Sequence, residues 1–150
     1  MANFVYNNFK EGLLVGSFNL QGTPTIRVLL ATNSYTPDID AHIYRSSISG
    51  TLEVVGTNYT SGGVALSSPN VQQDDTGNAG ALYGTNILWT PITASSIAYA
   101  VCYGSSGNGA ASDPLYFALD LGTDSSTANF WAVTGGTFLI SFTNPILQAT

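Results

Sequence analysis

The hydrophobic positions of the chain follow two patterns, a helical one near the N-terminus and a strand-like one over most of the rest. Over residues 3–14 the apolar side chains recur at the spacing of one helical face, at Val5, Tyr6, Phe9, Leu13 and Leu14. Asn3 is a residue type that caps helices, and Gly16 is one that ends them. The pattern therefore predicts an α-helix over about 3–14, with Phe4, Phe9 and Leu13 packed against the core.

After residue 22 the pattern changes to short β-branched and aromatic runs separated by Gly, Asn and Asp. Predicted strands cover about 23–32, 52–55, 64–67, 81–83, 87–90, 97–103, 114–121, 130–133 and 136–142. One short helix capped by Asp40 is predicted near 40–48. Strands at this density with Gly-rich turns are typical of a sandwich or barrel. We expect a mainly β fold, an antiparallel β-sandwich (jelly-roll-like) with an N-terminal α-helix.

The segment boundaries follow from the same pattern. We expect a single domain over residues 1–150, with the helix at about 3–14 and the sandwich at about 23–143. The end of the chain, about 144–150, keeps the apolar pair Ile146 and Leu147 beyond Pro145. This combination favours a C-terminal arm that docks on a neighbouring molecule.

Charge is scarce, and that scarcity excludes classes of partner. Only 8% of the 150 residues are charged, with three basic residues against nine acidic ones and a net charge of −6. Thr, Ser and Asn together supply 45 residues. Nucleic-acid binding needs a set of Lys and Arg side chains to neutralise phosphates, so we expect neither nucleic acid nor an anionic membrane as partner. No apolar run reaches the ~20 residues of a membrane-spanning helix.

The N-terminus lacks the pattern of a signal peptide, so we expect synthesis in a reducing cytoplasm. A lone cysteine, Cys102, allows no disulfide within the chain. One Cys and one His, His42, also allow no zinc spacing, and no cofactor or metal is expected.

The remaining candidates for catalysis are weak. His42 follows Asp38 and Asp40 in a D-x-D-x-H pattern, which turn chemistry explains without catalysis. Asp74 and Asp75 are adjacent, and adjacent residues of a strand point to opposite faces, unlike a glycosidase pair. We therefore expect that the protein is not an enzyme.

Several segments, in order along the chain, resemble a family of small virion proteins of tailed bacteriophages, encoded among head and tail genes. The segments are FVY at 4–6, KEGLL at 10–14, TIRVLL at 25–30, SYTPDIDAH at 34–42, EVVGTNYTSGG at 53–63, DDT at 74–76, the strand around Trp89, AVCY at 100–103 and SDPL at 112–115. The resemblance spans most of residues 1–143. It implies a capsid decoration (cement) protein on the capsid exterior that stabilises the shell of major capsid protein, without catalytic residues.

Two other functions stay open. One is a tail, neck or baseplate accessory protein of the virion, and the other is a glycan-binding module that uses the Tyr and Trp rings. For a shell protein we expect a homo-oligomer, with a trimer slightly favoured over a dimer. The expected contacts with partners are the loops at 35–42 and 74–78 and the C-terminal arm, specifically Tyr35, Asp38, Asp40, His42, Asp74, Asp75, Ile146 and Leu147.

Low charge also predicts where the few charges lie. A soluble domain normally carries a well-charged surface, and this chain replaces charge with Thr, Ser and Asn. We expect Arg27, Arg45 and Glu53 to be paired or placed at subunit contacts rather than scattered over the surface.

Overall fold

The computed structural model describes residues 3–22, 25–122, 130–142 and 145–149. In chain order the elements are β1 (Asn3–Val5), α1 (Asn7–Leu14), β2 (Thr25–Thr32), the 3-10 turns η1 (Arg45–Ile48) and η2 (Gly50–Leu52), β3 (Gly56–Thr57), β4 (Val64–Ala65), β5 (Asn70–Asp74), β6 (Ala79–Tyr83), β7 (Ile87–Ser105), η3 (Ala110–Ser112), β8 (Leu115–Asp120), β9 (Trp131–Ile140) and β10 (Leu147–Ala149). All strand pairs are antiparallel. The predicted class, mainly β with one α-helix near the N-terminus, is confirmed.

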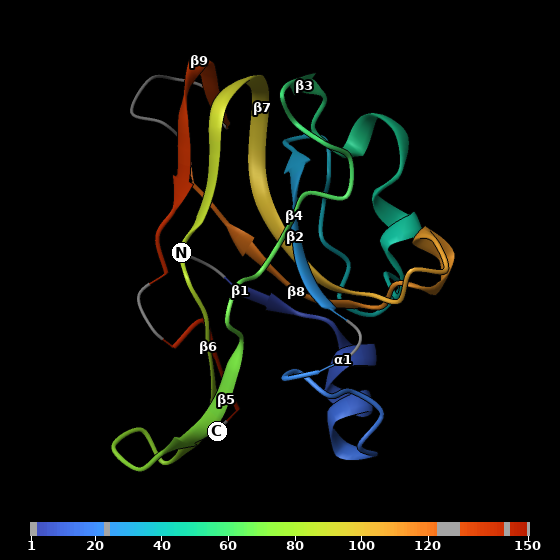
Figure 1. Ribbon diagram of the computed structural model, residues 1–150. Helices are drawn as coiled ribbons and strands as arrows, with labels where there is room; N and C mark the ends of the chain where they lie inside the picture. Colours follow the sequence, from blue (N-terminus) through green and yellow to red (C-terminus); the bar gives the residue numbers. More distant parts are fainter. Residues whose placement is uncertain (1–2, 23–24, 123–129, 143–144, 150) are drawn as a thin grey trace.

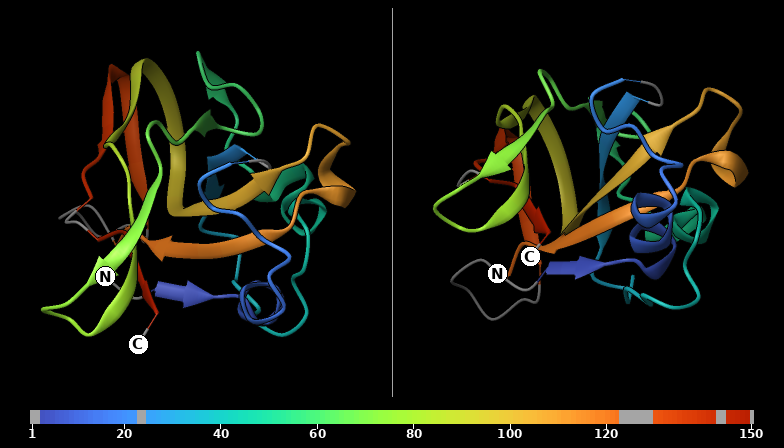
Figure 2. Two further views of the ribbon diagram at one scale, coloured as in Figure 1. Left: turned by 60° about the horizontal axis from the view of Figure 1, so that its bottom comes forward. Right: turned by 90° about the horizontal axis from the view of Figure 1, so that it is seen from below.

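Two sheets build the molecule (Figure 1). The larger sheet has the order β1-β8-β7-β2-β4, and β3 and β9 pair with the first half of β7. The smaller sheet has the order β10-β6-β5. The hairpin of β5 and β6 extends away from the rest of the molecule (Figures 1 and 2). This projection leaves β5 at a free edge.

The long strand β7 joins the two halves of the larger sheet. Its second half lies between β2 and β8, whereas its first half pairs with β9 through three register shifts between Trp89 and Ile97. Extra residues of this kind bend a strand and increase its twist. The sequence pattern predicts two separate strands here, at 87–90 and 97–103, because the intervening Pro91 and Ser96 interrupt the hydrophobic alternation.

The central strands are buried on both faces, which explains their nearly continuous hydrophobic runs. In β2, Ile26, Val28 and Leu30 join a large cluster on one side, and Leu29 and Ala31 join a second cluster on the other side. The large cluster also contains Phe9 of α1 and residues of β6, β7 and β9. Packing is therefore sandwich-like, with the helix closing one part of the core.

The predicted N-terminal helix is too long. Residues 3–5 form β1 and pair with Phe117–Leu119 of β8, and Tyr6 is an extended N-cap residue before α1. Backbone pairing with the edge of β8 stabilises residues 3–5 as a strand, although Val5 and Tyr6 have the spacing of a helical face. Phe9 is buried as predicted, whereas Leu13 is exposed.

The predicted short helix near 40–48 is present only as the 3-10 turn η1 (Arg45–Ile48). Asp38, rather than Asp40, caps the local turn, because its Oδ1 accepts hydrogen bonds from the backbone amides of Asp40 and Ala41, both at 3.0 Å. The chain then enters the one-turn η1, which begins only at Arg45. The same hydrogen bonds occur in Asx-turns and at helix N-caps, and here the backbone continues as a turn over residues 39–41 before η1.

Candidate interaction surface

A buried carboxylate holds the turn at residues 59–63. Oε1 of Glu53 accepts hydrogen bonds from the Tyr59 hydroxyl at 3.0 Å and the Gly62 amide at 2.5 Å, and Oε2 accepts one from the Ser61 hydroxyl at 2.9 Å. Burial and the Glu53 charge raise the pKa of Tyr59, so this hydroxyl stays protonated and donates. Hydrogen bonds to an ionised acceptor are about twice as strong as neutral ones.

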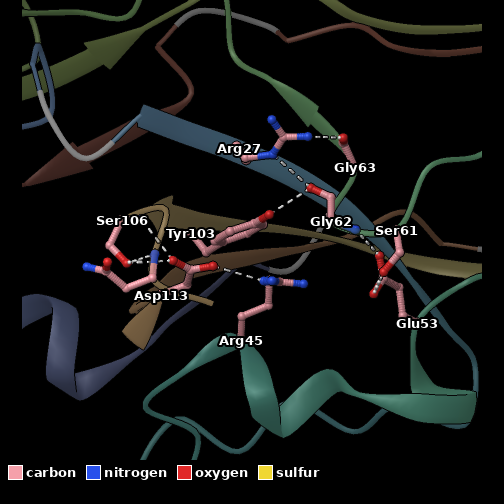
Figure 3. Close-up of polar contacts among 10 residues, drawn as sticks. Arg27, Arg45, Glu53, Ser61, Gly62, Gly63, Tyr103, Ser106 and Asp113 are labelled. Atoms are coloured by element: carbon pink, nitrogen blue, oxygen red, sulfur yellow. Dashed lines mark hydrogen bonds and ion pairs between the residues drawn. The ribbon is translucent and has the colours of Figure 1, made fainter. Parts of the chain in front are cut away.

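Arg27 holds the same turn from its other side (Figure 3). Its Nε donates to the Gly62 carbonyl at 3.2 Å and its Nη2 donates to the Gly63 carbonyl at 2.5 Å, while the Tyr103 hydroxyl also donates to Gly62 at 2.7 Å. Gly63 has a φ of +64°, and a Cβ there would lie 1.8 Å from the Val28 carbonyl oxygen. Only glycine fits this close approach between the turn and β2.

Arg45 forms an ion pair with the buried Asp113, with 3.1 Å between Nε and Oδ2. The other carboxylate oxygen of Asp113 accepts hydrogen bonds from the amide and hydroxyl of Ser106, at 2.8 and 3.0 Å. The Arg45 guanidinium also lies 5.3 Å from the centre of the Tyr103 ring, within cation–π range. These contacts join η1, the end of β7 with the following Ser106, and Asp113 between η3 and β8 (Figure 3).

The prediction for these charges is confirmed for Arg45, which is paired. Arg27 and Glu53 are also bound within the fold, although to backbone and hydroxyl groups rather than to opposite charges. Across the described residues, Glu11 and Asp75 are the only charged side chains without a hydrogen bond to another described residue. Charge therefore serves mainly to stabilise turns.

The loop at 35–42 contains one buried and several exposed candidates. Tyr35 is only 1% exposed, so the expectation that it lies at the surface is wrong. Its hydroxyl bonds the Tyr6 hydroxyl at 2.6 Å and lies 3.1 Å from Nδ1 of His42. The Asp38 amide lies 3.2 Å from the same Nδ1, and because an amide can only donate, Nδ1 is an acceptor.

Titration in this loop reflects the same contacts. Hydrogen bonds from the backbone amides of Ala41 and Asp40 lower the pKa of Asp38. Burial raises the pKa of Tyr35 to about 12. Asp40 is exposed and accepts a hydrogen bond from Asn7 of α1, which ties the loop to the helix.

The second predicted contact region lies at the β5–β6 hairpin. Asp74 ends β5, and its Oδ1 accepts hydrogen bonds from the amides of Thr76 and Gly77, at 3.1 and 3.0 Å. Its Oδ2 accepts one from the side chain of Gln148 in β10, at 3.0 Å, and Asp75 is exposed. A hollow of about 550 Å³ lies along this hairpin, lined by residues 71–75 and 78–80.

The end of the chain packs on its own molecule over residues 145–149. β10 pairs with β6, and Ile146 is only 6% exposed within the large core cluster. Leu147 is partly buried against the same cluster. The expected exposure of Ile146 is therefore wrong, since its apolar side chain completes this chain's own core. Residues 144 and 150 of the predicted arm lie outside the described residues.

Neither the lone cysteine nor a cluster of metal-ligating side chains forms a reactive site among the described residues. Cys102 is buried, and burial raises the pKa of its thiol. Among the described residues no three His, Cys, Asp or Glu side chains are grouped to hold a metal ion. The helices of the described part include none that is long and apolar enough to cross a membrane.

Several large apolar side chains are exposed on the surface of the described residues. Leu14 and Val15, at the end of α1, are 88% and 68% exposed, and Val55 is 85% exposed. The paired residues Leu88 and Leu139 are also exposed, on the outer side of β7 and β9. Sequence reasoning missed these positions, together with strand β5, because a surface strand rich in Asn and Gln has the composition of a loop.

No family model, curated protein or solved structure matches this chain. Any functional assignment therefore has to rest on the residues themselves.

Proposed function

We propose that this chain is a non-enzymatic structural protein of a tailed-phage virion, a decoration protein that binds the outside of the capsid and stabilises its shell. The observation that carries the proposal is the distribution of charge: most charged side chains are bound within the fold, whereas large apolar side chains are exposed. A broad contact with a shell favours such a surface, since desolvating an unpaired charge costs several kcal/mol. The partners would be the major capsid protein and further copies of this chain.

Of the predicted contact residues, those that remain available on the surface are Asp38, Asp40, Asp75 and, partly, His42, Asp74 and Leu147. Asp75 is the sharpest choice for a test because its side chain is exposed and makes no hydrogen bond to another described residue. A substitution there removes no contact described within the fold.

The test uses purified protein and expanded capsids. We expect the protein to co-sediment with capsids and to raise the temperature at which they open. Asp75→Arg should weaken binding at least tenfold, and Asp75→Asn, which removes the charge without reversing it, should weaken it less. Absence of binding to capsids would overturn the proposal, and binding to tails or to one vertex would support a tail, neck or baseplate protein instead.

Most of the aromatic side chains do not favour a glycan-binding module, and Tyr44, which is 42% exposed, is the exception. Trp89 and the rings of Tyr6, Tyr35, Tyr103 and Tyr116 are buried, and Trp131 is partly buried and donates to the Leu121 carbonyl at 3.1 Å. Stacking on a sugar requires an open ring face.

A further inference from the structure

Strand β5 presents an open backbone edge. It pairs with β6 on one side, and its other side is the end of the smaller sheet. Residues 70–73 are all exposed, and the hairpin extends away from the body (Figures 1 and 2). Proteins usually protect such an edge with Lys, Pro or a bulge, and within β5 there is none of these.

The direction of one carbonyl defines which residues face outward. The side-chain amide of Gln21 donates to the Val71 carbonyl at 3.0 Å and to Oδ1 of Asn70 at 2.9 Å. The Val71 carbonyl therefore points away from β6. Because the direction alternates along a strand, Gln73 also directs its N–H and C=O to the open edge.

From this edge we propose that β5 pairs antiparallel with β5 of a second copy, across a two-fold axis at Gln72. In this register Val71 lies opposite Gln73 of the second copy, and the two residues exchange both backbone hydrogen bonds. A carbonyl has two lone pairs, so Gln21 and the second copy can both donate to Val71. All five residues of β5 find a partner in this register.

Charge favours this edge as the place where two copies meet. Two molecules that each carry a net charge of −6 repel each other least where a neutral segment of one meets a neutral segment of the other, and residues 70–73 are neutral. In this register Asp74 lies opposite Asn70 of the second copy. The two Asp74 carboxylates are then four residues apart, about 13 Å at a rise of ~3.3 Å per residue, and the Debye length at physiological salt is about 8 Å.

The other edge of the smaller sheet is less open. β10 has three residues, and a groove of about 370 Å³ between it and α1 is lined by Leu147, Gln148, Leu13 and Leu14 among others. A strand added to β10 would meet the helix, whereas the described hydrogen bonds to the outer side of β5 come from the Gln21 side chain alone. The β5 contact is two-fold symmetric, so it favours a dimer over the trimer that the sequence analysis slightly prefers.

A cysteine at the two-fold axis tests the contact directly. Gln72 lies opposite its own copy in a non-hydrogen-bonded pair, where the Cα atoms are ~4.5 Å apart, within disulfide range. We expect Gln72→Cys to form a covalent dimer under mild oxidation, since the native Cys102 is buried and supplies no competing thiol. Gln73→Cys is the matched control: its two copies are two residues out of register, and its dimer yield should be at least tenfold lower.

Sedimentation equilibrium of the free protein gives an independent readout. Gln72→Glu places like charges opposite each other and close to both Asp74 carboxylates, and it should raise the dimer dissociation constant at least tenfold, with an unchanged far-UV circular dichroism spectrum. A monomeric native protein, a trimer without the Gln72→Cys crosslink, or equal crosslinking of both cysteine variants would overturn the contact.

The contact deepens the self-association in the proposed function and rests on it only in that respect, so the two can fail separately. Crosslinking without capsid binding would remove the virion role and leave the dimer. Capsid binding by a protein that never crosslinks through Gln72→Cys would remove the dimer and leave the virion role.

Discussion

Two buried tyrosine hydroxyls have opposite surroundings, and that difference predicts opposite effects of removing them. The Tyr6 hydroxyl bonds the Tyr35 hydroxyl at 2.6 Å, whereas the Tyr116 hydroxyl has no partner among the described residues. Tyr6→Phe should lower the free energy of unfolding by about 1 kcal/mol, and Tyr116→Phe should leave it unchanged or raise it by up to about 1 kcal/mol. Urea denaturation of both variants measures this, and equal losses would contradict it.

At the turn bound by Arg27 and Glu53, glycine at position 63 is a steric requirement. Gly63→Ala adds a Cβ that would lie 1.8 Å from the Val28 carbonyl oxygen, in a residue whose φ is +64°. Gly107 has a similar φ of +79° but open space around it, so Gly107→Ala isolates the backbone strain. We expect Gly107→Ala to cost about 1 kcal/mol and Gly63→Ala at least about 2 kcal/mol more, measured by thermal unfolding. Similar losses for both would show that the turn moves to accommodate a methyl group.

Asp38 predicts a dependence of stability on pH. Backbone hydrogen bonds lower its pKa in the folded state, so its charge stabilises the fold above the unfolded pKa of about 3.9 and loses this effect as pH falls through the folded pKa. Asp38→Asn keeps an oxygen acceptor and removes the charge. The variant should be less stable than the native protein at neutral pH, and the difference should shrink as pH falls below the unfolded pKa of about 3.9. A difference that persists in acid would assign the effect to the lost geometry of the turn.

At the scale of elements, the buried strands could be predicted and the partly exposed ones could not. The continuous run of β2 is hydrophobic because neighbours cover both of its faces, so the pattern is strong. By contrast, β1 and β10 are three-residue strands that exist only because β8 and β6 offer edges to them. A local pattern also does not reveal which distant segment covers a side chain. For this reason the sequence predicts Tyr35 and Ile146 as contacts with partners, although both are buried within the chain.

The loop that follows β7 depends on Asp113. Its carboxylate binds Arg45 and the amide and hydroxyl of Ser106, so one side chain connects three segments. Asp113→Asn should cost about 2–4 kcal/mol, because Arg45 keeps its charge and loses its partner. Asp120→Asn, at a half-buried carboxylate that binds the Gly122 amide, should cost less than about 1 kcal/mol. Chemical denaturation measures both, and equal effects would contradict a special role for Asp113.

Across the whole molecule, the few charged side chains have a structural role. Arg27, Arg45, Glu53 and Asp113 are placed where turns meet the sheet, and the hydrogen bonds they form specify a few close approaches. The composition predicts that Arg27, Arg45 and Glu53 are paired or placed at subunit contacts, but it could not identify backbone carbonyls and amides as partners, because such groups leave no pattern in the sequence. The remaining surface is neutral or apolar over large parts, including the open edge of β5.

A neutral contact between acidic molecules should respond to salt in the opposite sense to an ion-paired one. Two copies at a net charge of −6 repel each other, and no opposite charges attract across β5 in the proposed register. Raising the ionic strength from about 0.01 M to about 0.15 M shortens the Debye length from about 30 Å to about 8 Å and screens that repulsion. The dissociation constant of the β5 dimer should therefore fall as salt rises, by sedimentation equilibrium at fixed pH. A constant that rises with salt would require attractive charge pairs across the contact, and β5 supplies none, so a different surface would then join the copies.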